Sequence, residues 1–181
     1  LQAYGIGQGV RAAVMLKPSI EFFLVMFALL KIGAVPVLID PGIARSALKQ
    51  CLAEAQPKAF IGIPLAHAAK LVLGWAPSVR LKVTTGPLAL FGGKTLKAIE
   101  RLGRASRRGL PEIQRDDAAA ILFTSGSTGV PKGVLYRHRH FTAQVQLLKQ
   151  AFSVEPGGVS LPTFPPFALF DPALGLTSVI P

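Results

Sequence analysis

A short segment in the second half of the chain concentrates residues that bind phosphate. Residues 124–133 combine hydroxyl side chains with glycines and with one lysine, Lys132. Glycine lets the backbone approach a ligand closely and turn its N–H groups toward it. The hydroxyl groups can donate hydrogen bonds to phosphate oxygens, and Lys132 adds a positive charge. The segment therefore predicts a phosphate-binding loop.

Two other interpretations of this segment exist. The P-loop of nucleotide hydrolases requires Ser or Thr directly after its lysine, whereas Gly133 follows Lys132, so that class is disfavoured. A flexible surface turn rich in serine and glycine is the structural alternative. The segment directly follows an apolar stretch, Ala118–Phe123, that is typical of a buried strand. This position favours the phosphate-binding loop over the surface turn.

The segments around the loop predict an α/β fold. Apolar strands are expected at Val10–Leu16, Ala34–Ile39, Ala59–Ile63, Val79–Val83, Ala118–Phe123 and Val134–Tyr136. Helices are expected from Pro18 to a stop at Gly33, and at Ala44–Ala55, Leu65–Trp75 and Phe141–Phe152. Strands that are apolar throughout, without alternation, are typical of a sheet buried on both faces. We therefore expect a mostly parallel sheet with helices covering both faces.

Composition limits the kinds of partner. The net charge is +11, and arginines cluster between Arg101 and Arg115. Such a cluster can bind nucleic acid or an acidic membrane surface. Neither zinc-ligand spacing nor interleaved aromatic residues accompany it, so we expect a solvated basic linker and no nucleic-acid partner. The surrounding stretch Thr84–Gln114 predicts a long, poorly ordered connection.

Other features bear on metals, membranes and compartment. His67, His138 and His140 lack cysteine or carboxylate neighbours at ligand spacing, so no metal site is expected from them. The apolar run Ile20–Leu30 is too short for a transmembrane helix, which needs roughly 20 residues. A single cysteine, Cys51, suits a reducing compartment, and we expect a cytoplasmic protein.

The run Ile121–Gly133 resembles the signature loop of the adenylate-forming superfamily, which includes acyl-CoA synthetases, luciferases and peptide-synthetase adenylation domains. A second segment, Leu30–Pro41, is similar to the superfamily's upstream helix-to-strand motif. The resemblance implies that a carboxylate and ATP form an acyl-adenylate and pyrophosphate, with Mg²⁺ as cofactor, before a second nucleophile displaces AMP. It also implies an ATP-binding set: Thr124, Ser125, Gly126, Ser127, Thr128, Gly129 and Lys132.

Residues 161–172 indicate a subgroup. Coenzyme A ligases usually have a histidine here, and this chain has none. The segment is most similar to β-lactone synthetases of bacterial long-chain olefin biosynthesis, in which the acid's own β-hydroxyl attacks the activated carboxyl. Phe164, Phe167 and Phe170 then form a channel for an alkyl chain, although three aromatic residues could equally belong to the core. Asp171 could hold an amino group, as in peptide synthetases, but a role in capping a helix is preferred.

The resemblance also predicts the domain organisation. Residues 1–181 correspond to part of a large N-terminal AMP-binding domain: an α/β subdomain (1–83), the basic connection (84–115) and the loop with its following helices (116–181). The superfamily's catalytic lysine and magnesium-binding glutamate have no counterpart here, so catalytic residues stay unassigned and the 181 residues alone are expected to be inactive.

The expected substrate is a hydrophobic long-chain carboxylic acid, and other enzymes of an olefin-forming assembly are possible partners. A long-chain acyl-CoA ligase and a non-catalytic, anion-binding module are the alternative functions.

Overall fold

The structure is a computed structural model that describes residues 1–40, 42–89, 91–106, 108–124, 131–163 and 165–180, the side chains of Arg45 and Pro165 excepted. Its strands are β1 (Arg11–Met15), β2 (Val35–Ile39), β3 (Ala59–Gly62), β4 (Leu81–Thr84), β5 (Lys94–Thr95), β6 (Ala118–Thr124), β7 (Lys132–Arg137), β8 (Val159–Ser160) and β9 (Thr177–Ser178). Its α-helices are α1 (Ile20–Lys31), α2 (Arg45–Ala55), α3 (Pro64–Val72), α4 (Leu96–Ala105), α5 (His138–Ala151) and α6 (Asp171–Leu174). Short 3₁₀ helices are η1 (Gln2–Tyr4) and η2 (Pro165–Leu169).

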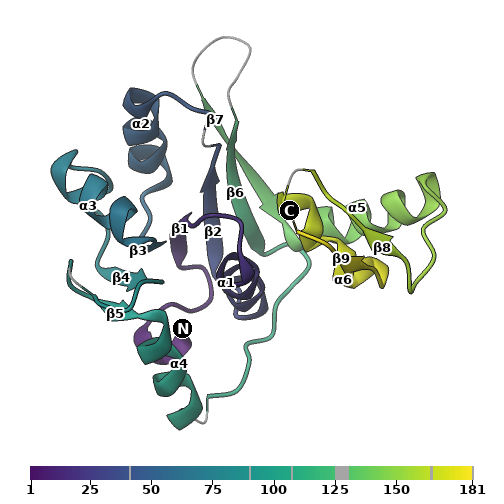
Figure 1. The fold of residues 1–181 in the computed structure, drawn as a ribbon, viewed down its shortest axis with the longest axis horizontal. Coiled ribbons are helices and arrows are strands. Elements are labelled where there is room, and N and C mark those ends of the chain that lie inside the picture. The colour runs from purple at the N-terminus through teal and green to yellow at the C-terminus, as the bar shows by residue number, and fades with distance from the viewer. Residues whose placement is uncertain (41, 90, 107, 125–130, 164, 181) are drawn as a thin grey trace.

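Within the described ranges, seven strands form one sheet in the order β5-β4-β3-β1-β2-β6-β7. Strands β1 to β6 run parallel to their neighbours, and β7 pairs antiparallel with β6 at one edge. Figure 1 shows this sheet and, beside it, the segment that holds α5, α6, β8 and β9. The prediction of a mostly parallel sheet is confirmed.

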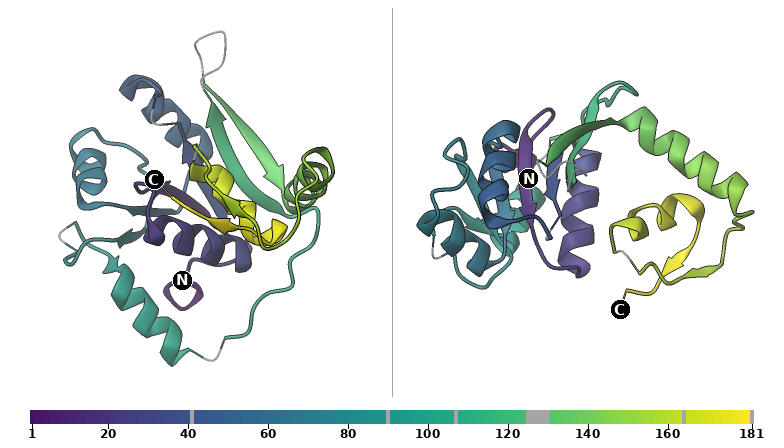
Figure 2. Two further views of the ribbon diagram at one scale, coloured as in Figure 1. Left: turned by 45° about the vertical axis from the view of Figure 1, so that its right-hand side comes forward. Right: turned by 90° about the horizontal axis from the view of Figure 1, so that it is seen from above.

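Helices cover both faces of the sheet. Because side chains alternate along each strand, both faces carry apolar side chains that need cover. On one face, Ala12 of β1 packs in the same hydrophobic cluster as Val25 of α1. On the other face, Ala13 joins Leu52 of α2 and Phe60 of β3. The second view in Figure 2 shows α1 on one side of the strands and α2 and α3 on the other. The predicted cover on both faces is confirmed.

The predicted connection Thr84–Gln114 contains strand β5 and helix α4, so that prediction is wrong for residues 94–105. The Thr95 Oγ1 atom accepts a hydrogen bond from the backbone N–H of Ala98 (3.2 Å) and starts the helix. Leu96 and Ile99, one turn apart, pack against the sheet, while the charged residues of α4 face solvent. The high content of glycine and arginine favours a loop, and the two apolar residues Leu96 and Ile99 are too short a pattern to predict the helix. Residues 108–114 have neither helix nor strand, as predicted.

His67 is a core residue of α3. It is 3% exposed, and its ring lies 4.9 Å from that of Phe60, measured between centroids. Its Nε2–H group donates a hydrogen bond to the backbone oxygen of Val83 (3.0 Å). Burial lowers the pKa of His67 below its ordinary value, and the nearby positive charges of Lys82 and Lys70 lower the pKa further. The folded protein therefore holds this imidazole in its neutral form.

This pKa shift predicts a loss of stability in acid. The unfolded chain binds a proton at His67 near the ordinary pKa of 6.5, whereas the folded chain does so only at lower pH. The stability that His67 contributes is therefore present above about pH 6.5 and is lost as the pH falls toward the folded pKa. We expect the thermal midpoint to fall less between about pH 8 and pH 5 for His67→Gln than for the natural protein, by calorimetry. Burial also lowers the pKa of His138, and this shift is present in the natural protein and in His67→Gln alike. Equal falls in the thermal midpoint of the two proteins would refute the assignment to His67.

Candidate functional site

The two ends of the predicted phosphate-binding loop lie side by side. Thr124 is the last residue of β6 and Lys132 is the first of β7, and the antiparallel register pairs them. Both residues are exposed. The predicted residues inside the loop lie outside the part of the chain that the structure describes: Ser125, Gly126, Ser127, Thr128 and Gly129. The pairing of β6 with β7, the hairpin in Figure 1, thus places a hydroxyl-bearing residue and a cationic residue opposite each other at one end of the hairpin.

Side-chain alternation puts the ends of this loop on the same face of the hairpin as a cavity. Leu122 of β6 lines the cavity, and Thr124 follows it two residues later, roughly 7 Å along the strand. On β7, Tyr136 lines the cavity and Lys132 precedes it by an even number of residues. Phe123, between Leu122 and Thr124, packs on the opposite face near α2. A ligand in the cavity can therefore extend along this face toward Thr124 and Lys132.

Gly133 keeps the base of the loop tightly packed. A Cβ atom at this position would lie 2.7 Å from the Cζ atom of Phe123 and 3.2 Å from the Oε1 atom of Glu54 on α2. Only a residue without a side chain fits here unless these neighbours move. The sequence predicts Gly133 as one of the loop glycines that let the backbone approach a ligand, but it does not predict this close packing against Phe123 and Glu54.

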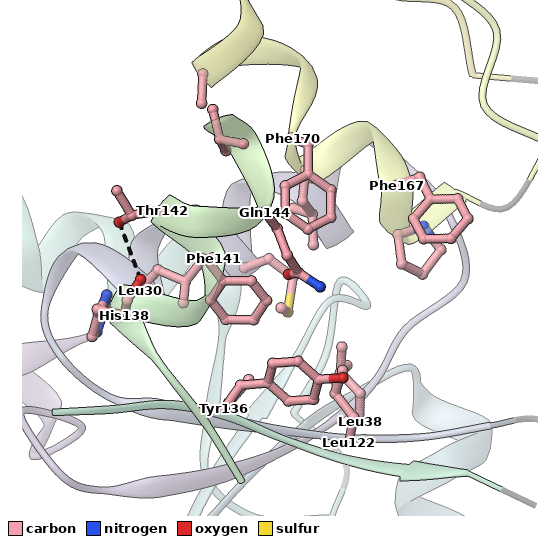
Figure 3. Close-up of a pocket in the computed structure, with 16 residues that line it drawn as sticks. Leu30, Leu38, Leu122, Tyr136, His138, Phe141, Thr142, Gln144, Phe167 and Phe170 are labelled. Atoms are coloured by element: carbon pink, nitrogen blue, oxygen red, sulfur yellow. Dashed lines mark hydrogen bonds between the residues drawn. The ribbon is translucent and has the colours of Figure 1, made fainter. Parts of the chain in front are cut away.

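The cavity has a volume of about 460 Å³, within the range of small-molecule sites. It lies between α1, the strands β2, β6 and β7, helix α5 and the segment of η2 and α6 (Figure 3). Its walls are formed by Met26, Leu30, Leu38, Ala120, Leu122, Tyr136, His138, Phe141, Thr142, Gln144, Val145, Pro166, Phe167, Leu169, Phe170 and Ala173. Phe167 and Phe170, predicted to line a channel, thus contribute to one wall. Phe164 lies outside the described residues.

Aromatic contacts hold the walls of the cavity together. The ring of Phe141 on α5 stacks on that of Tyr136 on β7, with centroids 5.4 Å apart. On its other side, Phe141 is 6.1 Å from the ring of Phe170, which immediately precedes α6. These contacts connect β7, α5 and the Phe167–Phe170 segment. The sequence predicts a helix that begins at Phe141, but it does not predict that this helix borders a cavity.

Polar groups interrupt the apolar wall at a few points. The Oγ1–H group of Thr142 donates a hydrogen bond to the backbone oxygen of His138 (3.1 Å). The buried Nε2 atom of His138 and the buried Oε1 atom of Gln144 have no hydrogen-bond partner among the described residues. Burial lowers the pKa of His138, and the negative charge of Asp117 partly opposes this shift. The imidazole in the wall is therefore neutral at neutral pH.

Asp171 has a different role from the preferred prediction. It begins α6, but its carboxylate does not cap the helix. Instead, the Oδ2 atom accepts a short hydrogen bond from the hydroxyl group of Ser178 on β9 (2.6 Å), and Asp171 is 5% exposed. The prediction of a helix cap is wrong, because the chain after α6 returns and brings Ser178 to the carboxylate. The carboxylate therefore connects α6 with β9.

Among the described residues, we find no group of three or more His, Cys, Asp or Glu side chains that could hold a metal ion. None of the helices in the described ranges is long and apolar enough to cross a membrane.

The amino-acid sequence of this chain is similar to those of known proteins. The family described as AMP-binding enzyme matches residues 1–177. Over 181 residues the chain is 69% identical to an olefin beta-lactone synthetase from Stenotrophomonas maltophilia and 66% identical to one from Xanthomonas campestris pv. campestris. Each alignment covers 100% of this chain and 33% of the relative, so the chain spans about a third of the length of these curated relatives.

The fold also matches a solved structure. The inhibitor-bound crystal structure of the N-terminal domain of FACL13 from Mycobacterium tuberculosis superimposes with a TM-score of 0.78. The alignment covers 99% of this chain and 46% of that chain at 22% sequence identity, which shows a shared fold. The predicted fold class, part of an N-terminal domain of this architecture, is therefore confirmed.

Proposed function

The chain belongs to the AMP-binding enzyme family, and on that premise we propose that the protein activates a long-chain fatty acid derivative with ATP. The resemblance inferred from the loop motif is thereby confirmed. The substrate that we propose is a 2-alkyl-3-hydroxy acid, and the product is a β-lactone. The observation that carries this proposal is the identity of 66% and 69%, over the whole chain, to two proteins named olefin beta-lactone synthetase.

The proposed reaction has two steps. A carboxylate oxygen of the acid attacks the α-phosphorus of ATP. The bond between this phosphorus and the oxygen that bridges to the β-phosphate breaks, which gives the acyl-adenylate and pyrophosphate. The oxygen of the acid's 3-hydroxyl group then attacks the acyl carbon, loses its proton, and displaces AMP. A four-membered lactone ring results. Coenzyme A takes no part in these two reaction steps.

The phosphate-binding loop would hold the nucleotide. We assign Thr124, Lys132 and the residues between them to the β- and γ-phosphates of ATP. The exposure of Thr124 and Lys132 and their pairing across the hairpin support this assignment. The glycines of the loop, Gly126 and Gly129, would let its backbone approach the phosphates.

The cavity would hold the acid. We assign Phe164, Phe167 and Phe170 to the binding of its alkyl chain. The apolar wall of the cavity and its position on the same face of the hairpin as Thr124 and Lys132 support this assignment.

Other parts of the proposal rest on family membership. Mg²⁺ is usual for nucleotides bound in this way, and we propose it as the cofactor, although the described residues offer no cluster of metal ligands for it. We propose that residues 1–83, 84–115 and 116–181 are successive parts of one N-terminal AMP-binding domain. We also propose that the protein acts in the cytoplasm, where ATP is available, and that enzymes of an olefin-forming assembly are its partners.

An assay without coenzyme A tests the proposed function. We use the full-length natural protein, the complete product of the gene that encodes this chain. With ATP, Mg²⁺ and a 2-alkyl-3-hydroxy acid, we expect AMP, pyrophosphate and a β-lactone, identified by mass spectrometry and NMR. Release of AMP only when coenzyme A is added would identify an acyl-CoA ligase instead. Absence of ATP turnover together with salt-sensitive binding of polyanions would indicate an anion-binding module.

A further inference from the structure

Gln144 places an amide group in the apolar wall of the cavity. The residue lies in the middle of α5 and lines the cavity together with Phe141 and Phe170. In Figure 3 its amide points into the space between Phe170 and Tyr136. Its Oε1 atom is buried and has no hydrogen-bond partner among the described residues. A polar group in this setting needs an explanation, because buried polar atoms in proteins are generally paired.

A bound water molecule does not explain this amide well. A buried water typically needs two to four polar partners, and apolar cavities tend to stay dry. Most neighbours of Gln144 along the wall are aromatic rings and aliphatic side chains such as Val145 and Ala173, and the hydroxyl group of Thr142 already bonds the backbone oxygen of His138. A hydroxyl group that is attached to an alkyl chain meets the requirement better, because the chain fills the apolar space while the hydroxyl pairs with the amide.

The position of Gln144 is held by its surroundings. Phe141 lies one helical turn before it and is stacked on Tyr136, with Phe170 on the other side. Gln144 therefore projects from a helix that is fixed to both β7 and the Phe167–Phe170 segment. A polar group that is held in place before a ligand binds gives more selectivity than a mobile one.

His138, the other wall residue with an unpaired buried atom, lies elsewhere in the cavity. It is six residues earlier on α5, roughly 9 Å along the helix axis. His138 also lines a second cavity with Gln114 and Arg115. Figure 3 shows His138 at one end of the first cavity and Gln144 near its middle. Gln144 is thus the residue placed to contact a group along a bound chain.

We propose that Gln144 determines specificity by forming a hydrogen bond with the 3-hydroxyl group of an acid bound in the cavity. This inference rests on the proposed function, whose substrate carries that hydroxyl. An acid of equal length without the hydroxyl would bury the same apolar surface but leave the amide unpaired. Sites built to pair with a hydroxyl reject the analogue that lacks it.

A binding experiment tests the proposal without relying on turnover. Isothermal titration of the full-length natural protein, without ATP, compares a 2-alkyl-3-hydroxy acid with the 2-alkyl acid of the same chain length. We expect the hydroxy acid to bind about 10- to 100-fold more tightly to the natural protein. Gln144→Met keeps the length of the side chain and removes the amide, and it should reduce this preference to about 3-fold or less.

The matched control is Val145→Ala, the next residue of α5, which also lines the cavity but has no polar group. It should weaken the binding of both acids by a similar factor and leave the preference unchanged. If Gln144→Met lowers the thermal midpoint markedly, Gln144→Leu replaces it. A preference that survives in the amide-free variant overturns the proposal, and so does a natural protein that binds both acids equally.

Exchange of pyrophosphate into ATP, measured on the natural protein, separates this inference from the proposed function. Exchange with both acids at equal efficiency overturns the role of Gln144 and leaves ATP-dependent acid activation intact. If neither acid supports exchange, the proposed activity fails, while the binding preference and its loss in Gln144→Met still decide whether Gln144 recognises the hydroxyl.

Discussion

Lys132→Ala in the full-length natural protein is expected to slow acid-dependent exchange of pyrophosphate into ATP by about 100-fold or more. Lys132 is the exposed cation at the end of the loop, and it pairs with Thr124 across the hairpin. As the bond between the α- and β-phosphates breaks, negative charge develops on the departing pyrophosphate. A fixed positive charge stabilises that change more than it stabilises bound ATP, so the main loss should be in kcat. Steady-state exchange rates at several ATP concentrations give kcat and KM separately.

Lys97→Ala is the matched control for this variant. Lys97 is exposed on α4, next to β5 at the opposite edge of the sheet from β7. It carries the same charge but lies far from the loop in the order of strands, so its removal should leave kcat within about 2-fold of the natural protein. Natural kcat in Lys132→Ala, or equal losses in both variants, would show that Lys132 does not act on the phosphates.

The sheet and the ends of the loop could be predicted from the sequence because each depends on local pattern. Apolar stretches such as Ala34–Ile39 and Ala59–Ile63 are too uniformly hydrophobic for a half-exposed strand, and the structure places β2 and β3 there inside a parallel sheet. Thr124 and Lys132 flank one continuous motif. Their proximity follows once Ala118–Phe123 and Val134–Tyr136 pair as neighbouring strands.

The cavity could not be predicted in this way. Its wall combines Met26 of α1, Leu38 of β2, Leu122 of β6 and Gln144 of α5, which are far apart in sequence. No local pattern tells which face of α5 borders an open space, because the same apolar residues would pack equally well in a solid core. From the sequence alone, only Phe164, Phe167 and Phe170 are predicted to line a substrate channel, through the resemblance of residues 161–172 to a known segment.

Other misses have local physical causes. The carboxylate of Asp171 was expected to cap a helix, since Asp-Pro commonly begins one. The hydrogen bond from Ser178 depends on how the chain returns after α6, which the dipeptide does not encode. Helix α4 was missed because its apolar contact is short: Leu96 and Ile99 pack inward among many charged neighbours.

Gly93→Ala is expected to destabilise the folded protein by about 3 kcal/mol or more, because two unfavourable terms add. Gly93 has φ of +90°, in the left-handed region that residues with a side chain rarely adopt. A Cβ atom there would also lie 2.3 Å from the backbone oxygen of Lys82 on β4. Backbone atoms of a paired strand cannot move as a flexible side chain can, so β5 and the start of α4 would have to shift.

Calorimetry of the full-length natural protein measures this effect as a fall in the thermal midpoint. Gly9→Ala is the control, since Gly9 also has positive φ (+74°) but has no atom within 4 Å of the added Cβ. That variant should cost about 1 kcal/mol, from backbone strain alone. The difference between the two variants therefore isolates the clash with Lys82. Equal falls in midpoint would mean that β4 and β5 separate at little cost, and that the close approach of Gly93 to β4 is not needed for the fold.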